Sequence, residues 1–168
     1  LALALFFAGA APHAAGEVSA AAPLLLRTPT VSATAVVFAY ADDLWIVGRE
    51  GGAARRLTTG VGIESNPLFS PDGRTVAFTG EYDGNVDAFT VPVDGGEPTR
   101  LTSNASGDAA EEWYPDGKSI LVRSSSHSNI QRYSRFFKIA LPGCFPELLP
   151  LPIAGYACVE GSKVTLRA

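Results

Sequence analysis

The chain of 168 residues contains no methionine, two cysteines and two histidines. With so few histidines and cysteines, the sequence contains no His/Cys cluster of the kind that binds zinc. Lysine and arginine number 13 against 17 acidic residues, and the net charge is -4. A nucleic-acid-binding surface needs an excess of basic side chains to meet the phosphates, so this charge balance argues against a nucleic-acid partner. The sequence predicts neither a metal nor a cofactor.

Long hydrophobic runs are also lacking, and only the first residues come near one. Leu1 to Ala11 has the length of a signal-peptide core and is too short to span a bilayer, and small residues around Ala14 and Ala15 offer a cleavage site before Glu17. We expect residues 1–22 to be a truncated signal peptide and linker. The mature protein would then be periplasmic or secreted, with no membrane span. A buried N-terminal strand or helix is the alternative.

A short motif, in contrast, is used twice. Ser70 to Phe78 reads SPDGRTVAF and Tyr114 to Val122 reads YPDGKSILV, so Pro-Asp-Gly recurs after 44 residues. Proline in second place and glycine in fourth suit a type I β-turn, because the proline ring fixes φ and glycine accepts the exit conformation. The alternating apolar residues that follow predict a strand with one buried face. The predicted turn residues are Pro71, Asp72, Gly73, Pro115, Asp116 and Gly117.

The repeat extends beyond this turn. Asp43 and Trp45 are matched by Asp87 and Phe89 after 44 residues, and more loosely by Arg135–Ile139 after a further 48. We expect the four matched residues to be structural, the aspartates bonding backbone amides of a neighbouring loop. In every copy a leucine follows the aromatic residue by 12 positions, and the pairs are Trp45 and Leu57, Phe89 and Leu101, and Phe137 and Leu149.

A repeat of about 40 to 45 residues made of short strands and glycine-rich turns is typical of a β-propeller, with one four-stranded blade per repeat. One blade alone cannot offset the entropy lost in ordering it, so blades must stack. We therefore predict an all-β, incomplete propeller over residues 23–156. The chain would be a fragment, since known propellers have about four to eight blades. The expected blades are at about 25–62, 63–106 and 107–152, the third one damaged.

The order of several segments resembles the N-terminal propeller of tricorn-type serine peptidases, whose blades are TolB-like. These segments read DLWIV, GG-x-x-RRLT, SPDG, GEYDGN-x-D, WYPDGKSILVRSSSHSN and LPLPIAGY, and they run from about Leu25 to Tyr156. The resemblance implies a full-length oligomeric enzyme with two propellers, a PDZ module and a C-terminal region bearing a serine nucleophile and a histidine. None of that catalytic region lies in this chain, so no catalytic residue is predicted here.

The last residues depart from the family pattern. Gly161 lies 44 residues after Gly117, but the family register of LPLPIAGY would place the turn glycine two residues later, at Lys163. We therefore expect residues 157–168 to be an irregular or divergent tail.

Two functions of different class follow. In the first, the propeller gates or positions peptide or protein substrates for a secreted tricorn-like serine peptidase whose chemistry lies elsewhere in a homo-oligomeric full-length protein. In the second, it is a non-enzymatic TolB-like propeller that binds proteins in the periplasm. The propeller of a prolyl-oligopeptidase type enzyme fits DLWIV and GEYDGN less well.

Individual polar residues give weak functional signals. His127 lies in RSSSHSN, but neighbours on one hairpin loop do not reproduce a serine–histidine pair, and no G-x-S-x-G elbow occurs. Asp83, Asn85 and Asp87 have spacing that faintly resembles a calcium loop, without its closing glutamate.

Turns explain these residues better. Asp83-Gly84 is predicted as a two-residue hairpin turn with φ positive at both places, and Asp42-Asp43 as the corresponding turn in the first repeat. Cys144 and Cys158 could pair in an oxidising compartment, but their spacing does not decide it.

Overall fold

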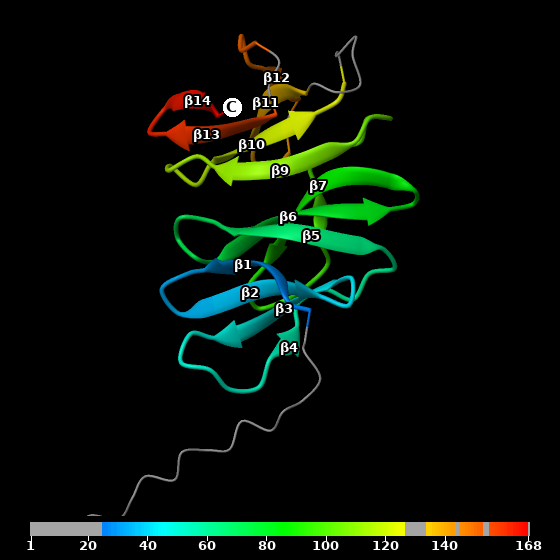
Figure 1. Cartoon of the computed structure of the whole chain (residues 1–168), viewed down its shortest axis with the longest axis vertical. Coiled ribbons are helices and arrows are strands. Elements are labelled where there is room, and N and C mark those ends of the chain that lie inside the picture. Colours follow the sequence, from blue (N-terminus) through cyan, green and yellow to red (C-terminus); the bar gives the residue numbers. More distant parts are fainter. Residues whose placement is uncertain (1–24, 127–133, 144, 153–154, 168) are drawn as a thin grey trace, which may run out of the picture.

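The computed structural model describes residues 25–126, 134–143, 145–152 and 155–167, and every regular element among them is a β-strand. The strands form three four-stranded antiparallel sheets and a two-stranded hairpin. Figure 1 shows the sheets following one another along the long axis in chain order. The predicted all-β fold of stacked four-stranded units is confirmed. The third unit has all four strands, although the sequence suggested a damaged copy.

Within each sheet, neighbouring strands in the chain are neighbours in space. The first sheet contains β1 (Arg27–Val31), β2 (Ala35–Tyr40), β3 (Asp43–Gly48) and β4 (Arg55–Arg56). The second contains β5 (Ile63–Phe69), β6 (Thr75–Tyr82), β7 (Asn85–Pro92) and β8 (Thr99–Arg100). The third contains β9 (Asp108–Trp113), β10 (Ser119–Ser124), β11 (Arg135–Ala140) and β12 (Glu147–Leu148).

The Pro-Asp-Gly motifs form the turns into β6 and β10. Gly73 N donates to Ser70 O at 2.8 Å, and Gly117 N donates to Tyr114 O at 2.9 Å. Both glycines have positive φ, 69° and 66°, a conformation that glycine adopts without a Cβ clash. Pro71 and Pro115 precede the aspartates Asp72 and Asp116 inside these turns.

Alternation along the middle strands explains why the sheets stack. On β6, Val76 and Phe78 face the first sheet, while Ala77 faces the third. On β10, Ile120 and Val122 face the second sheet, while Leu121 lies in a separate core with β11 and the hairpin. β6 and β10 are thus buried on both sides, and the apolar cores lie between sheets.

The leucine that follows each aromatic residue fixes the outer strand. Leu57 N donates to Leu44 O at 2.7 Å, Leu101 N to Ala88 O at 2.8 Å, and Leu149 N to Phe136 O at 2.9 Å. These bonds are equivalent in the three repeats, so a short fourth strand is held to the third strand in the same way each time.

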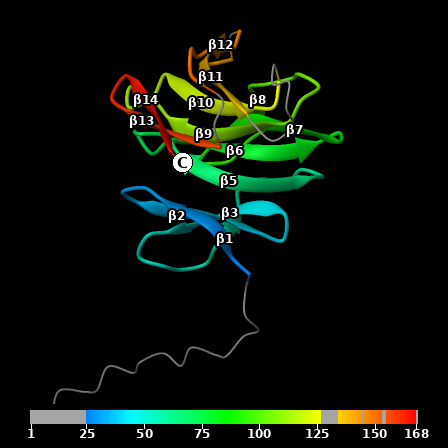
Figure 2. The ribbon, with the colours of Figure 1, turned by 45° about the horizontal axis from the view of Figure 1, so that its top comes forward.

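The predicted irregular tail is wrong for residues 157–167. β13 (Tyr156–Glu160) and β14 (Lys163–Arg167) form a hairpin whose turn contains Gly161 at φ 63°. Ala157 packs in a core with Leu121 and Phe136, and Val159 N donates to Glu112 Oε2 at 2.6 Å. Figure 2 shows the hairpin beside the third sheet.

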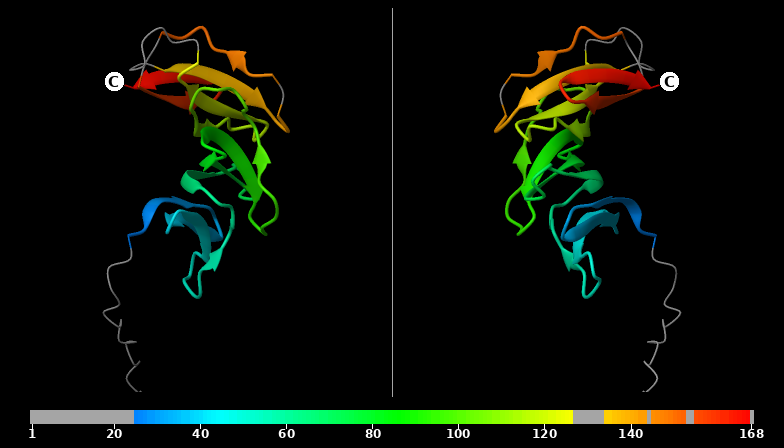
Figure 3. Two further views of the ribbon diagram at one scale, coloured as in Figure 1. Left: turned by 90° about the vertical axis from the view of Figure 1, so that its right-hand side faces the viewer. Right: turned by 90° about the vertical axis from the view of Figure 1, so that its left-hand side faces the viewer.

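The sheets follow a curved arc rather than a closed ring (Figure 3). Among the described residues, no helix has the length and apolar character needed to cross a membrane.

Candidate functional site

The predicted turn at Asp83 and Gly84 joins β6 to β7, with φ of 55° and 77°. Positive φ at both places is the type I′ geometry of a tight hairpin. Asn85 follows the turn and donates from Nδ2 to Asp87 Oδ2 at 2.7 Å and to Asn104 O at 2.9 Å. The described residues contain no group of three or more His, Cys, Asp or Glu side chains that could hold a metal.

Asp43 and Asp87 occupy equivalent places at the start of β3 and within β7. Asp43 accepts a charged hydrogen bond from Arg56, and Asp87 accepts one from Arg100. Thr102 Oγ1 also donates to Asp87 Oδ1 at 3.0 Å. The prediction of backbone-amide partners is therefore wrong for these bonds. The groups that meet the carboxylates are arginine guanidiniums, the Thr102 hydroxyl and the side-chain amide of Asn85.

The two aromatic residues next to these aspartates differ in burial. Trp45 is half-buried, and its Nε1 donates to Tyr40 O at 3.1 Å. Phe89 is buried and stacks on Phe78 with ring centroids 5.6 Å apart.

In the first two sheets, a threonine after the short fourth strand accepts a hydrogen bond from a backbone amide of the third strand. Leu44 N donates to Thr58 Oγ1 at 3.0 Å, and Ala88 N donates to Thr102 Oγ1 at 3.0 Å. Both threonines are buried. The Thr102 hydroxyl therefore satisfies the Ala88 amide inside the stack, and the Leu44 amide is shared between Thr58 and a carboxylate of the next sheet.

An acidic residue from the next sheet reaches into each of these polar clusters. Glu64 Oε2 accepts bonds from Leu44 N at 3.0 Å and from Thr58, and Glu64 Oε1 accepts one from Tyr82 OH. Burial raises the pKa of Glu64 against the opposing effect of these donors. Burial and the neighbouring Glu64 also raise the pKa of Tyr82, so its hydroxyl stays a donor.

Asp108 holds the equivalent place in the next cluster, 44 residues after Glu64. Its Oδ2 accepts a bond from Asn104 Nδ2 at 2.6 Å. No group in the described part of the chain makes a well-aligned hydrogen bond to Asp108 Oδ1, although the hydroxyls of Ser124 and Thr102 lie close by. Burial raises the pKa of Asp108 most, and the charge of Asp87 raises it further.

The sequence did not point to Thr58, Thr102, Glu64 or Asp108. Their own spacing was the available signal, because each pair is separated by the same 44 residues as Asp43 and Asp87. A repeated polar residue at a fixed offset from a repeated aspartate indicates a shared cluster.

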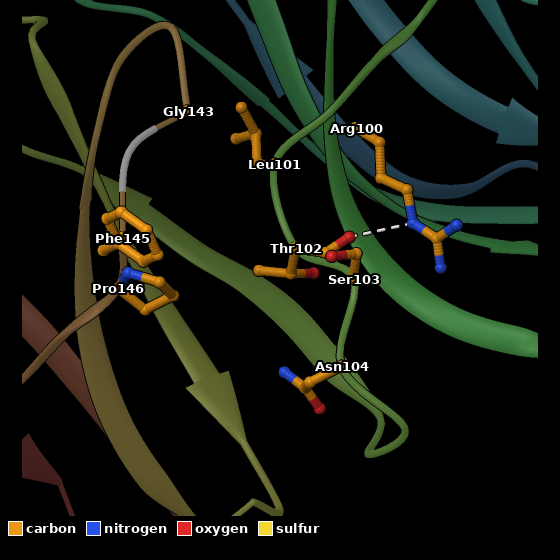
Figure 4. Close-up of a pocket in the computed structure, with 8 residues that line it drawn as sticks. All are labelled: Arg100, Leu101, Thr102, Ser103, Asn104, Gly143, Phe145 and Pro146. Atoms are coloured by element: carbon orange, nitrogen blue, oxygen red, sulfur yellow. Dashed lines mark hydrogen bonds between the residues drawn. The ribbon is translucent and has the colours of Figure 1, made fainter.

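A groove runs beside the second cluster, between the connection from β8 to β9 and the connection from β11 to β12. It has a volume of about 610 Å³ (Figure 4). Arg100 Nε donates to Thr102 O at 2.8 Å on one wall, and the almost fully exposed Phe145 stands on the other. The lining residues are Arg100, Leu101, Thr102, Ser103, Asn104, Gly143, Phe145 and Pro146.

A smaller pocket of about 210 Å³ adjoins the groove. The two cavities share Thr102, Asn104 and Pro146, and the small pocket reaches Asp108. Its remaining wall residues are Val122, Ser124, Ser126, Phe137 and Ile139.

This arrangement can bind a group that combines apolar surface with a hydrogen-bond donor. The polar side chains around the two cavities are the Asp108 carboxylate, hydroxyls, the Asn104 amide and the Arg100 guanidinium. His127 and Cys144 lie outside the described residues. The pairing of Cys144 with Cys158 therefore stays a prediction. Cys158 is half-buried in β13.

Comparison with known proteins shows where this fold occurs. A family model described as the tricorn protease N-terminal beta propeller domain matches residues 23–167. Tricorn protease homolog 1 of Streptomyces coelicolor is 32% identical over 118 residues, covering 70% of this chain and 11% of the relative. A tricorn-like protease N-terminal subunit of Sulfurisphaera tokodaii is 28% identical over 143 residues, covering 82% of this chain and 72% of that subunit.

Solved structures agree on the fold. The crystal structure of the tricorn protease superposes with a TM-score of 0.72 at 21% identity, covering 84% of this chain and 15% of that one. TolB from Acinetobacter baumannii gives a TM-score of 0.63 at 16% identity, covering 80% of this chain and 34% of that one. The chain spans only 11%, 13% and 9% of the length of the first three curated relatives.

Proposed function

Because the chain belongs to the family of tricorn protease N-terminal β-propeller domains, we propose that it forms the opening blades of the propeller of a secreted serine peptidase. In this role the propeller gates or positions peptide substrates, and hydrolysis takes place in other parts of the full-length protein. The match of the family model across residues 23–167 is the observation that carries the proposal.

The cavities next to the second polar cluster support a binding role. The groove of about 610 Å³ is bordered by polar backbone and by the exposed ring of Phe145. Concave sites with apolar walls and a few placed polar groups are the usual form of ligand pockets. A peptide segment could lie in this groove without any chemistry from the propeller itself.

Peptidase assays on two proteins test this function. The protein encoded by the uninterrupted reading frame should hydrolyse short peptides, and the 168-residue chain alone should not. Phe145→Ala in the full-length protein should raise KM severalfold with kcat unchanged, because the ring would contact substrate outside the catalytic region. Leu25→Ala is the matched control, since Leu25 is also exposed but precedes β1 of the first sheet and does not line the groove.

Two outcomes would contradict the proposal. A full-length protein without peptidase activity would exclude the enzyme, and hydrolysis by the isolated chain would place catalysis in the propeller. If Phe145→Ala and Leu25→Ala change KM equally, the groove does not position the substrate.

Export and assembly belong to the same proposal. The apolar run Leu1 to Ala11 supports secretion, and the mature protein is then periplasmic or extracellular. A reporter enzyme that works only outside the cytoplasm, fused after residue 22, should be active. We also propose a homo-oligomer, which light scattering of the full-length protein would measure directly.

The TolB-like architecture favours one alternative, a non-enzymatic propeller that binds proteins. TolB from Acinetobacter baumannii shares the fold at a TM-score of 0.63. The reading frame separates the two functions, because a PDZ-like segment and a serine-bearing region after the propeller support the peptidase. A protein that stops after about six blades would support the binding module.

A further inference from the structure

Grooves of the same kind lie at two successive junctions between sheets. The groove described above, which we call the second groove, lies between the β8–β9 and β11–β12 connections. A first groove of about 510 Å³ lies between the equivalent connections of the preceding junction, β4–β5 and β7–β8. The repeat of the chain therefore produces a repeat of its surface.

Arg100 on β8 lines both grooves, so the two form one continuous surface. Its guanidinium donates to the fully buried Asp87, and its Nε donates to Thr102 O at 2.8 Å. The guanidinium also lies 6.0 Å from the centroid of the Phe89 ring. These contacts fix the arginine between the grooves, and Asp87 compensates its charge.

The two grooves differ at one equivalent position of their walls. Pro98 lines the first groove and Pro146 the second, 48 residues later, which is also the offset between the matching leucines of these repeats. By this offset Glu97 in the first groove corresponds to Phe145 in the second. Glu97 is exposed, and so is Phe145. One groove thus presents a carboxylate where the other presents an aromatic ring.

The first groove has further features that suit a basic side chain. Asp83 in the turn between β6 and β7 adds a second carboxylate to its lining. Neither Asp83 nor Glu97 forms an ion pair with another residue of the described segments. Val61, which is 96% exposed, supplies apolar surface from the β4–β5 connection. A lysine or arginine can pack its stem on such a residue while its charged head stays near the carboxylates.

We propose that this continuous surface binds an extended peptide that places a basic side chain in the first groove and an aromatic side chain in the second. The aromatic ring packs on Phe145 and Pro146. Stacked sheets lie about 10 Å apart and an extended chain advances about 3.3 Å per residue, so the two side chains are three residues apart in the peptide. The assignment rests on the peptide-positioning role proposed above and adds the composition of the peptide.

Amide chemical shifts of the ¹⁵N-labelled 168-residue chain measure the binding. The peptides acetyl-Lys-Ala-Ala-Phe-amide and acetyl-Phe-Ala-Ala-Lys-amide test the two chain directions. One of them should shift the amides of both Glu97 and Ser103, which line the first and the second groove. If neither peptide shifts them at millimolar concentration, the proposal is wrong.

Substitutions in the peptide that binds test the two side chains separately. Replacing its lysine by glutamate should weaken binding about fivefold at low salt, and added salt should reduce this difference because exposed charges are screened. Replacing its phenylalanine by alanine should weaken binding about fivefold through lost apolar contact. Equal affinity for the lysine and glutamate peptides would overturn the proposal, and so would equal affinity for the phenylalanine and alanine peptides.

Variants of the protein assign the basic residue to the first groove. Glu97→Gln should lower the preference for lysine over glutamate about twofold and leave the effect of the phenylalanine unchanged. Asp94→Asn is the matched control, because Asp94 is exposed on the same connection and does not line the groove. Glu97→Phe should make acetyl-Phe-Ala-Ala-Phe-amide bind more tightly than the lysine peptide, since both walls then carry a ring. A preference that Glu97→Gln and Asp94→Asn change equally would exclude the first groove as the site.

Binding and hydrolysis are measured separately, so this proposal and the peptidase role can fail independently. Charge-dependent binding to the 168-residue chain, combined with a full-length protein that hydrolyses no peptide, would support the surface and exclude the peptidase. Hydrolysis by the full-length protein, combined with no preference for the lysine peptide in binding, would support the peptidase and overturn the surface.

Discussion

The aspartates Asp43 and Asp87 hold equivalent places but differ in exposure, and this difference should be measurable. The side chain of Asp87 is 0% exposed and that of Asp43 is 12% exposed, while their arginine partners are 45% exposed for Arg56 and 38% for Arg100. Removing one partner of a buried pair leaves the remaining donors unsatisfied, whereas a more solvated pair contributes little.

Asp87→Ala should therefore lower the free energy of unfolding by about 3 kcal/mol, and Asp43→Ala by about 1 kcal/mol. The larger loss also reflects Thr102 and Asn85, which both donate to Asp87. Urea denaturation of the two variants measures the difference. Equal losses would show that burial of the carboxylate is not what distinguishes the two clusters.

Asp108 should make stability depend on pH. Burial raises the pKa of its carboxyl, so the folded chain binds this proton more readily than the unfolded chain does. The stabilising contribution is complete below the ordinary pKa of 3.8 and is lost as pH rises through the raised value. Glu64, whose pKa is also raised, has the same sign.

Asp108→Asn should consequently stabilise the protein at pH 7, by an amount on the order of 1 kcal/mol, because the amide carries no buried charge. The gain should shrink as the pH is lowered toward 3.8 and vanish only below it, where the carboxyl is protonated in both states. Thermal unfolding of both proteins between pH 4 and pH 8 checks this. A gain that is constant across that range would exclude the titration of Asp108 as its cause.

At the scale of elements, the residues of the hairpin turn between β2 and β3 suit its backbone poorly. Ala41 and Asp42 have φ of 49° and 67°, the geometry that Asn-Gly adopts most easily. Replacing them by Ala41→Asn with Asp42→Gly should raise the free energy of unfolding by about 1 kcal/mol.

In the turn between β6 and β7, the opposite substitution, glycine to alanine, can be made at a position of positive φ. Gly84 has φ 77°, and an added Cβ would meet no atom within 4 Å, so Gly84→Ala isolates the backbone cost. We expect a loss of about 1 kcal/mol from it. Both effects are read from the midpoint of urea unfolding, and a stabilising Gly84→Ala would contradict the importance of positive φ in these turns.

Elements whose signals are local in sequence were predictable, and those set by distant contacts were not. The Pro-Asp-Gly turns at Gly73 and Gly117 could be predicted because their residue types fix φ. The first hairpin turn was placed one residue late, at Asp42-Asp43, because an alanine at positive φ has no signature of its own. It is held there by the pairing of Tyr40 with Asp43.

The hairpin of β13 and β14 was missed because two registers disagreed. The 44-residue spacing from Gly117 pointed to Gly161, while the family pattern pointed to Lys163. Gly161 is in the turn with φ 63°, so the repeat spacing was the better guide. Apolar contacts of Ala157 with Leu121 and Phe136 could not be read from the segment alone.

The polar clusters of the candidate site could likewise be predicted only in part from the sequence. Asp43 and Asp87 were identified as structural because they recur, but their arginine partners lie across a strand pair. Glu64 and Asp108 come from the next sheet, so their contacts depend on how sheets stack. A single repeat read by itself therefore cannot reveal them.

At the scale of the whole molecule, each sheet depends on its neighbours for a core. Phe78 is fully buried between the first and second sheets, and Trp113 is 7% exposed between the second and third. Because the middle strand β6 contributes to both cores, we expect the three sheets to unfold together. This mutual dependence is the central physical claim about the fold.

The two tryptophans test it directly, since Trp45 reports on the first sheet and Trp113 on the third, and the chain has no others. Trp45→Phe and Trp113→Phe each leave one reporter, and Phe78→Ala is added to both. Loss of the buried ring should cost about 3 to 5 kcal/mol and move the urea midpoints of both fluorescence transitions down together. A Trp113 transition that stays in place while the Trp45 transition moves would contradict a cooperative stack.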